Sequence, residues 1–228
     1  PTQHSTTGFY TMTQDIQRAV RILHKGGLVA FPTETVYGLG ADASNPEAVA
    51  RIFEVKGRPA TRPLTVHLGP HADYSYWTHW TNDAQKLADH FWPGPLTLVL
   101  PRKDHVPDIT TGGFSTVGLR VPSHPMAITL LDAYGGGVAA PSANRSGQIS
   151  PTSAAAVAKQ LGHSIDLILD GGECQIGLES TVLSLVDGPT ILRPGAISMD
   201  RIQAVLATRI TESPNAAKSN MKLSLPLQ

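Results

Sequence analysis

Positive charges gather on one short stretch of the chain, residues 56–67. Lys56, Arg58 and Arg62 fall within seven residues, with a glycine and two prolines among and beside them. Because proline and glycine interrupt helices, this stretch is predicted to form a stiff loop that enters an apolar strand over 64–68. Such a loop can direct its cations at a bound anion, although a solvated surface loop would have a similar composition. The chemistry that it indicates is anion binding.

Other loops next to short apolar strands carry polar groups of different kinds. Their hydroxyl, carboxylate, amide and guanidinium groups belong to Thr33, Glu34, Thr35, Thr116, Arg120, Ser142, Asn144, Ser146, Ser150, Glu179, Ser180, Thr181 and Arg193. Arginine suits bidentate contacts with phosphate or carboxylate, whereas lysine supplies a compact charge. Loops at strand ends converge on one face of an α/β sheet, so together they predict a pocket for a polyanionic ligand.

The common motifs of nucleotide binding and hydrolysis are absent from the sequence. It contains no Gly-x-x-x-x-Gly-Lys-[Ser/Thr], Gly-x-Gly-x-x-Gly, Gly-x-Ser-x-Gly or His-Glu-x-x-His pattern. The single cysteine, Cys174, excludes an intramolecular disulfide and a cysteine-rich metal site. The nine histidines are scattered singly, so a metal centre built from protein side chains is not expected.

Composition places the chain among globular proteins. Of its 228 residues 41% are hydrophobic, and 18 basic residues balance 18 acidic ones. Anion binding must therefore come from local clustering rather than from a positively charged surface as a whole. The apolar runs are too short to span a bilayer, and the polar first residues do not resemble a signal peptide. We expect a cytoplasmic protein with no membrane contact.

The hydrophobic pattern predicts helices and strands in mixed order. Helices are predicted at 13–25, 46–56, 82–92, 124–134, 153–161 and 199–207. Strands are predicted at 28–31, 64–68, 96–100, 116–121, 138–140, 165–169, 181–186 and 190–192, and residues 32–40 are predicted to form a loop. Because the order lacks a strict βαβ period, an α/β (α+β) fold with a mixed sheet is favoured over a doubly wound one. The predicted division is an N-terminal arm (1–12), one catalytic domain (13–208) and a linker or C-terminal tail (209–228).

Seven segments, taken in order, resemble the YrdC/TsaC family of threonylcarbamoyl-AMP synthases. They are Phe-Pro-Thr-Glu-Thr-Val-Tyr-Gly-Leu (31–39), Lys-Gly-Arg-Pro (56–59) with Pro-Leu-Thr-Val-His (63–67), Trp-Pro-Gly-Pro-Leu-Thr (92–97), Gly-Leu-Arg-Val-Pro (118–122), Pro-Ser-Ala-Asn (141–144), Glu-Ser-Thr-Val (179–182) and Leu-Arg-Pro-Gly (192–195). The resemblance covers roughly residues 12–208. It implies a YrdC-like twisted mixed sheet, flanked by helices, with a concave basic cavity.

The resemblance also implies an activity. Members of this family are nucleotidyltransferases that condense L-threonine, bicarbonate and ATP into threonylcarbamoyl-AMP and pyrophosphate. Mg²⁺ would be bound through the ATP phosphates rather than by protein side chains. A downstream complex would transfer the threonylcarbamoyl group to tRNA, to which the protein itself could also bind.

The family's site residues fall on matching positions of this chain. The resemblance implies a catalytic tetrad of Lys56, Arg58, Ser142 and Asn144, which also binds ATP. Further ATP contacts would come from Arg62, Thr116, Ser150 and Arg193, and L-threonine would be bound by Thr35, His67, Arg120, Ala140 and Ser180. Arg62 departs from the family, which commonly has asparagine there, but its charge could still face phosphate. Longer members have a second domain after a linker, so the chain is expected to be either a single-domain form or a truncated one.

Two other interpretations remain. An RNA-binding or ribosome-maturation module, for example one that binds double-stranded RNA, could use the same basic cavity, although the neutral net charge disfavours it. The related carbamoyl-transfer domain of hydrogenase maturation proteins accompanies acylphosphatase-like and zinc-finger segments, which do not fit in a chain with one cysteine.

Overall fold

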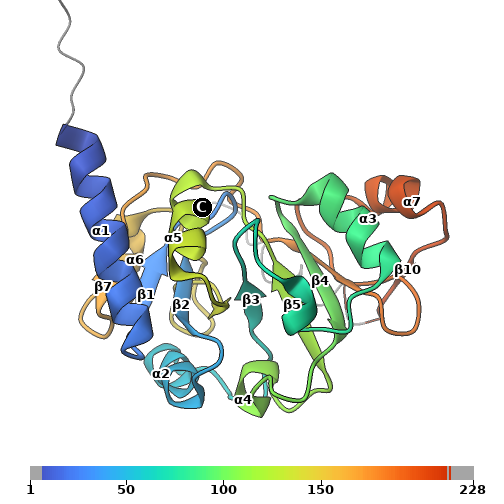
Figure 1. Ribbon diagram of the computed structural model, residues 1–228, viewed down its shortest axis with the longest axis horizontal. Helices are drawn as coiled ribbons and strands as arrows, with labels where there is room; N and C mark the ends of the chain where they lie inside the picture. Colours follow the sequence, from blue (N-terminus) through green and yellow to red (C-terminus); the bar gives the residue numbers. More distant parts are fainter. Residues whose placement is uncertain (1–6, 215, 217–228) are drawn as a thin grey trace, which may run out of the picture.

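The computed structural model describes residues 7–214 and residue 216, and its strands form one mixed sheet (Figure 1). The strands are β1 (Val29–Phe31), β2 (Gly38–Asp42), β3 (Thr65–His67), β4 (Leu96–Pro101), β5 (Thr116–Arg120), β6 (Val138–Ala139), β7 (Leu167–Ile168), β8 (Thr181–Ser184), β9 (Thr190–Arg193) and β10 (Thr211–Glu212). Their order across the sheet is β10-β9-β8-β4-β5-β3-β6-β2-β1-β7. The sheet contains both parallel pairs, such as β3 with β5, and antiparallel pairs, such as β4 with β5. The predicted mixed sheet is confirmed.

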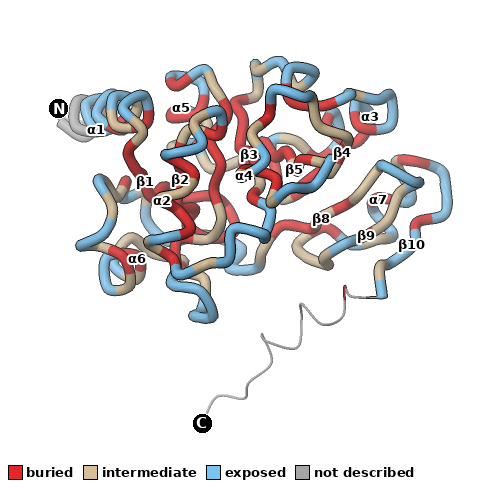
Figure 2. The backbone as a smooth tube through the Cα atoms, turned by 90° about the horizontal axis from the view of Figure 1, so that it is seen from below, coloured by how far each residue is buried: buried red, intermediate tan, exposed pale blue. Residues whose placement is uncertain are grey.

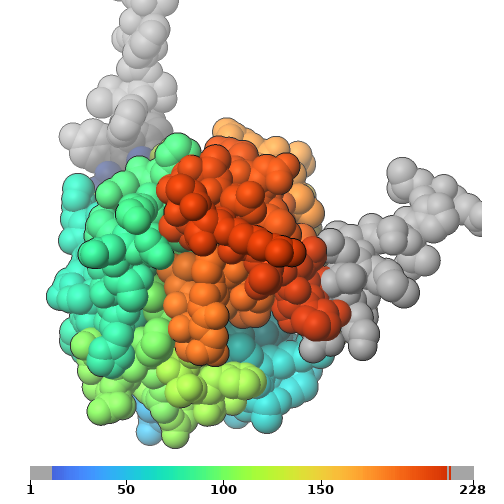
Figure 3. All heavy atoms as spheres, turned by 90° about the vertical axis from the view of Figure 1, so that its right-hand side faces the viewer, coloured from blue at the N-terminus to red at the C-terminus, as the bar shows by residue number. Residues whose placement is uncertain are grey.

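Helices cover the sheet in pairs. They are α1 (Thr7–His24), α2 (Pro46–Lys56), α3 (Asn82–Phe91), α4 (Asp108–Thr111), α5 (Pro125–Tyr134), α6 (Ala154–Leu161) and α7 (Met199–Leu206), with a short 3-10 helix at Tyr74–Tyr76. Helix α1 packs beside α5, α2 beside α4 and α3 beside α7 (Figure 1). Figure 3 shows the C-terminal elements, orange to red, lying next to the green segment that contains α3.

Three clusters of buried side chains hold these layers together. One lies around α2 and the central strands, one joins α1 and α5 to β1, and one joins α3 and α7 to β4, β8 and β9. The buried segments coincide with the central strands and the inner faces of the helices, whereas the edge strand β10 is exposed (Figure 2). None of the helices in the described part of the chain is long and apolar enough to cross a membrane.

The structure differs from the sequence-based prediction at both ends of the domain. Helix α1 begins at Thr7 rather than at residue 13, so residues 7–12 are not part of an extended arm. The apolar residues Phe9 and Met12 continue the helical spacing of Ile16, which explains the earlier start. At the other end, β10 lies within the predicted linker and pairs in parallel with β9, while the adjacent Ile210 is buried. Residues 1–6, 215 and 217–228 of the predicted arm and tail lie outside the described residues.

Strand β2 is the third difference, because residues 38–40 belong to the segment that was predicted to be a loop. Its sequence, Gly-Leu-Gly-Ala-Asp, has low β-propensity, yet β2 pairs with β1 and β6 inside the sheet. A Cβ atom on Gly40 would lie 2.7 Å from Cγ1 of Val138 and 2.9 Å from Cε1 of Phe31. Glycine is therefore required by a close approach, which a propensity pattern cannot reveal.

Lys56, the first predicted cation of the candidate site, lies at the C-terminus of α2, and this helix has well-defined caps. The side-chain oxygen of Asn45 accepts hydrogen bonds from the amides of Glu47 (3.0 Å) and Ala48 (3.1 Å), and Gly57 ends the helix with φ of 61°. We expect Asn45→Ala to lower the free energy of unfolding by about 1 kcal/mol, because two amides lose their acceptor. Urea denaturation measures this, with Asn45→Asp as the control that keeps the cap. Equal stability of the alanine variant and the wild type would contradict it.

Candidate active site

A polar cavity of about 160 Å³ lies where loops and strand ends meet near the centre of the sheet. Its lining comprises Thr33, Thr35, Val36, Gly38, Arg58, Pro63, Leu64, Thr65, His67, Arg120, Ala140, Pro141, Ser142, Glu179, Ser180 and Arg193. Eight of the thirteen predicted site residues are among them: Thr35, Arg58, His67, Arg120, Ala140, Ser142, Ser180 and Arg193. Residues from six strands or their adjoining loops thus meet at one place.

An apolar groove adjoins the cavity. It shares Pro63, Leu64, Thr65 and Arg193 with the cavity and also contains Thr116. The cavity is smaller than the range of about 300–1,000 Å³ that is typical of ligand sites. A ligand as large as a nucleotide would therefore have to extend beyond the cavity, and the groove offers a continuous surface for it.

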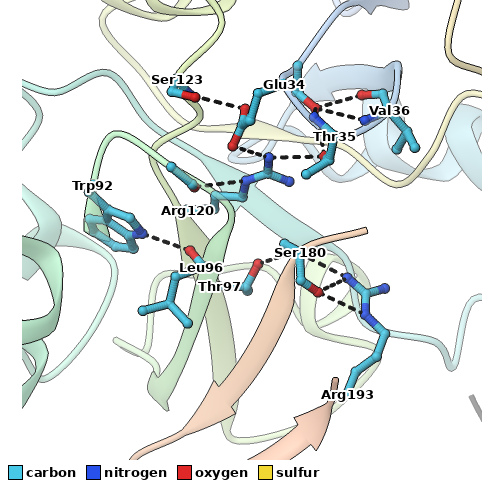
Figure 4. Close-up of polar contacts among 12 residues, drawn as sticks. Glu34, Thr35, Val36, Trp92, Leu96, Thr97, Arg120, Ser123, Ser180 and Arg193 are labelled. Carbon is cyan, nitrogen blue, oxygen red and sulfur yellow. Dashed lines mark hydrogen bonds and ion pairs between the residues drawn. The ribbon is translucent and has the colours of Figure 1, made fainter. Parts of the chain in front are cut away.

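Arg120 is held in a fixed orientation by a buried carboxylate. Its Nη2 lies 2.6 Å from Oε1 of Glu34 and donates to Oγ1 of Thr35 at 3.1 Å, while its Nε donates to the carbonyl oxygen of Gly94 at 3.3 Å (Figure 4). Arg120 and Glu34 are both almost fully buried. Within the described part of the chain, Nη1 of Arg120 has no hydrogen-bond partner. This nitrogen is available to a ligand carboxylate.

Glu34 is itself fixed by the backbone. Its Oε2 accepts a hydrogen bond from the amide of Ser123 at 3.0 Å, so both carboxylate oxygens have partners. A buried ion pair is tolerated when its remaining lone pairs are satisfied in this way. From the sequence, Glu34 was predicted only as a loop carboxylate, with no role in binding either substrate.

The threonines beside Glu34 form a tight local network. Oγ1 of Thr33 donates to the carbonyl of Val36 at 2.6 Å and accepts from the amides of Thr35 and Val36, each at 3.2 Å. Because the Thr33 proton is used by Val36, the 2.9 Å contact between the two threonine hydroxyls is donated by Thr35. The Thr35 hydroxyl is therefore oriented before any ligand binds. Thr33 was not among the predicted site residues.

His67 lies in the cavity wall as a neutral imidazole. Burial, followed by the charge of Arg120, lowers the pKa of His67 to about 3. Its Nδ1 is buried and has no hydrogen-bond partner among the described residues. A neutral ring with such a low pKa is a weak base, so its geometry favours a hydrogen bond to a ligand over proton abstraction at neutral pH.

A second network joins Arg193 to Ser180, as Figure 4 shows, and also to Glu179. Nε and Nη2 of Arg193 donate to the Ser180 carbonyl at 3.2 and 2.9 Å, and Nη2 also reaches the Ser180 hydroxyl at 3.1 Å. Nη1 forms an ion pair with Glu179, whose other oxygen accepts from the Ser150 hydroxyl at 2.9 Å. Burial lowers the pKa of Arg193, whereas Glu179 opposes that shift. Ser150 does not line the cavity but contacts it through Glu179.

Lys56 holds the loop over residues 141–147 in place through hydrogen bonds. Its Nζ donates to the carbonyl oxygens of Ser142 and Asn144, and its own carbonyl accepts from the amide of Ser146 at 2.7 Å. Burial, followed by the charge of Arg58, lowers the pKa of Lys56 to about 7. Lys56 does not line the cavity, so in this structure it positions Ser142 rather than facing the cavity itself.

The remaining predicted residues take three different positions. Arg58 lines the cavity, donates from Nη2 to the Pro63 carbonyl at 3.2 Å, and its buried Nε has no partner among the described residues. Burial, followed by the charge of Arg62, lowers the pKa of Arg58. Arg62 is exposed and lies outside the cavity lining. Asn144 is buried in its own loop, where its Nδ2 donates to the carbonyls of Arg145 and Gln148.

Two carboxylates in the site, Glu34 and Glu179, were not among the predicted site residues. Each adjoins a predicted ligand residue in the sequence, and each neutralises an arginine, which lies 86 residues away for Glu34 and 14 residues away for Glu179. A charged residue inside a motif of otherwise uncharged site residues is the signal that could have indicated them. Within the described ranges, no group of three or more histidine, cysteine, aspartate or glutamate side chains could hold a metal ion.

Comparison with known proteins places this fold and cavity in a family. The family model for Sua5, YciO and YrdC proteins, described as "Telomere recombination", matches residues 21–195. The chain therefore belongs to the Sua5/YciO/YrdC family, as its sequence motifs predicted. The matched range includes every residue that lines the cavity, from Thr33 to Arg193.

The similar proteins include two named threonylcarbamoyl-AMP synthases. The one from Pyrococcus abyssi is 48% identical over 84% of this chain and 57% of its own length, and the one from Bacillus subtilis is 48% identical over 86% and 58%. A crystal structure of P. abyssi Sua5 complexed with L-threonine superposes with a TM-score of 0.81 at 48% identity, over 86% of this chain and 58% of that one. The chain thus spans somewhat more than half the length of these relatives.

Proposed function

We propose that this chain is an L-threonylcarbamoyladenylate synthase, which condenses L-threonine, bicarbonate and ATP into threonylcarbamoyl-AMP and pyrophosphate. The observation that carries the proposal is that one cavity contains two chemically different sets of groups. Arg120, Thr35, His67 and Ser180 offer one guanidinium nitrogen and several neutral hydrogen-bonding groups, which suit an amino acid. Arg58, Arg193 and Ser142 offer cations and a hydroxyl, and Arg193 also lines the adjoining groove, which suits a nucleotide. Similarity to named synthases, and to a Sua5 structure with L-threonine, supports this assignment.

The groups proposed for the amino acid would bind both polar ends of L-threonine. The free Nη1 of Arg120 would hold the carboxylate, in a charge-assisted hydrogen bond. The hydroxyls of Thr35 and Ser180 and the neutral ring of His67 would contact the rest, with backbone help at Ala140. The prior orientation of Arg120 and Thr35 reduces the entropy lost on binding.

The cationic groups would hold the triphosphate. A carbamate oxygen of N-carboxythreonine would attack the α-phosphorus of ATP, and the bond between that phosphorus and the leaving pyrophosphate would break. Arg58 and Arg193 would stabilise the negative charge that develops on the phosphates. Mg²⁺ would reach the cavity as part of the MgATP substrate, bound through phosphate oxygens. Because His67 is a weak base, most of the acceleration would come from alignment and electrostatics.

The product of the proposed reaction implies a second reaction that uses it. We propose that a separate transfer complex uses threonylcarbamoyl-AMP to modify tRNA, and that this chemistry takes place in the cytoplasm. Threonylcarbamoyl-AMP is a mixed anhydride and therefore a reactive acyl donor. It is expected to pass quickly to a nucleophile rather than accumulate.

Pyrophosphate release tests the proposed function. We expect release only when L-threonine, bicarbonate, ATP and Mg²⁺ are all present, and we expect Arg58→Ala to slow it about 100-fold because one charge-stabilising group is lost. Arg18→Ala, at an exposed position of α1, is the matched control and should retain wild-type activity. Pyrophosphate release that persists without threonine or bicarbonate would overturn the proposal. Binding of double-stranded RNA that weakens strongly with salt, without ATP turnover, would favour an RNA-binding module instead.

A further inference from the structure

We propose that Glu179 is an exchangeable anion, which neutralises the cationic wall of the cavity until a nucleotide phosphate displaces its carboxylate. This inference rests on the proposed function, since it concerns the same cavity and the same nucleotide. It assigns a role to a carboxylate that lines the cavity and has no place in the binding of either substrate. In this role Glu179 sets how strongly an anion must bind in order to occupy the site.

The contacts of Glu179 are those that a phosphate would need. One oxygen pairs with Nη1 of Arg193, and the other accepts the hydroxyl hydrogen of Ser150 at 2.9 Å. The family resemblance implies that both Arg193 and Ser150 contact the nucleotide. A carboxylate that holds both groups therefore occupies donors that ATP would use. Binding of ATP at these donors requires that the carboxylate move away.

Arg193 does not depend on Glu179 for its position. Nε and Nη2 of its guanidinium are fixed by the carbonyl and hydroxyl groups of Ser180. Ser180 is in turn buried, and its hydroxyl also lies 2.9 Å from that of Thr97. The guanidinium would thus stay in place if the carboxylate left, with Nη1 directed at the incoming group. An ion pair whose purpose was to position Arg193 would not need this second anchor.

The backbone around Glu179 is fixed, whereas its side chain has access to solvent. The carbonyl oxygen of Glu179 accepts from the amide of Ala196 at 3.2 Å, and the preceding segment is tied to the β1–β2 loop by the amides of Ile176 and Gly177. The Glu179 side chain is 32% exposed. Its carboxylate can therefore turn into water while the chain remains in place, and an ion pair whose two side chains are 31% and 32% exposed opposes this only weakly.

The charge of Glu179 acts on the cations of the site together. It lies close enough to raise the pKa values of Lys56, Arg58 and Arg193 against the lowering effect of burial. Without the charge of Glu179, the electrostatic repulsion among the buried cations of the cavity would be stronger. A phosphate group carries more negative charge than a carboxylate, so it can replace this stabilisation when it enters.

Titration calorimetry of Glu179→Gln with a non-hydrolysable MgATP analogue tests the exchange. Glutamine keeps the size of the side chain but loses the charge that competes with phosphate, so the analogue should bind roughly fivefold more tightly than to the wild type. Inorganic pyrophosphate should show a gain in the same direction. Glu173→Gln is the matched control, since Glu173 is exposed on the same segment and outside the cavity lining, and it should leave both affinities unchanged.

Unchanged or weaker binding by Glu179→Gln would overturn the exchange, as would an equal gain in Glu173→Gln. Glu179→Asp is a second variant in case glutamine impairs folding. Its shorter carboxylate cannot reach Arg193 and Ser150 together, so binding should again tighten, by a smaller factor. The two proposals fail separately, because wild-type protein that binds the analogue but never releases threonine-dependent pyrophosphate would refute the synthase and leave the affinity comparison valid.

Discussion

Arg120→Met is expected to lower the free energy of unfolding by about 3–5 kcal/mol, because it leaves the buried carboxylate of Glu34 without its counterion. Oε1 of Glu34 would lose the 2.6 Å contact with Nη2 of Arg120, and only the amide of Ser123 would still contact this side chain. In a domain of this size the loss corresponds to a fall in melting temperature of roughly 10 °C. Urea denaturation and calorimetric melting both measure it.

The double variant Glu34→Gln/Arg120→Met separates stability from ligand binding. Removing both charges eliminates the unpaired buried carboxylate, so most of the lost stability should return. Threonine binding should stay absent in the single and the double variant, because both lack the guanidinium that receives the amino-acid carboxylate. Threonine affinity that returns together with stability would show that Arg120 acts only as a structural ion. An Arg120→Met variant as stable as the wild type would contradict the ion-pair argument.

Lys56→Met is expected to reduce the rate of pyrophosphate release by about 100-fold in a folded protein. Methionine retains an apolar side chain of similar length but removes the donor that holds the carbonyls of Ser142 and Asn144. The loop that carries Ser142 would shift, and a displacement of about 1 Å near a reacting group can reduce a rate by this factor. Initial rates under saturating substrates measure the change, and circular dichroism verifies folding.

Lys159→Met is the matched control for this prediction. Lys159 lies exposed on α6, so the same substitution there changes the net charge equally without touching the 141–147 loop. Its rate should equal that of the wild type. If Lys56→Met also retained its rate, Lys56 would be no more than a loop support that the reaction does not require.

The fold was predictable where local signals are strong. Helix α2 has an asparagine cap, a proline in its first turn and a glycine at its end, and the structure places it at Pro46–Lys56 as the sequence predicts. Strand β4 likewise follows its apolar run. Strand β2 was missed because Gly40, which lowers its β-propensity, is required by close contacts with Val138 and Phe31. Strand β10 was missed because a polar pair, Thr211 and Glu212, gives no strand pattern by itself.

Eight of the thirteen predicted site residues line the cavity, but the sequence did not predict how they are arranged. Anion binding by Arg58, Arg120 and Arg193 was predictable from position alone, because Arg58 lies on the loop that leads into β3 and the other two arginines end β5 and β9. The sequence could not reveal that Glu34 would pair with Arg120, because 86 residues separate them along the chain. The sequence also could not show that Lys56 holds the 141–147 loop, whereas Arg58, two residues later, lines the cavity. These roles depend on the direction in which each side chain points in the folded structure, which the sequence pattern does not show.

Transfer of carbon from labelled bicarbonate tests the central claim most directly. Wild-type protein would be incubated with ATP, Mg²⁺, L-threonine and ¹³C-bicarbonate, and the products would be separated quickly and analysed by mass spectrometry. The account predicts an adenylate that contains both threonine and the labelled carbon, formed together with an equal amount of pyrophosphate. Formation of ADP and phosphate, or of AMP and pyrophosphate without any labelled threonine adduct, would contradict it.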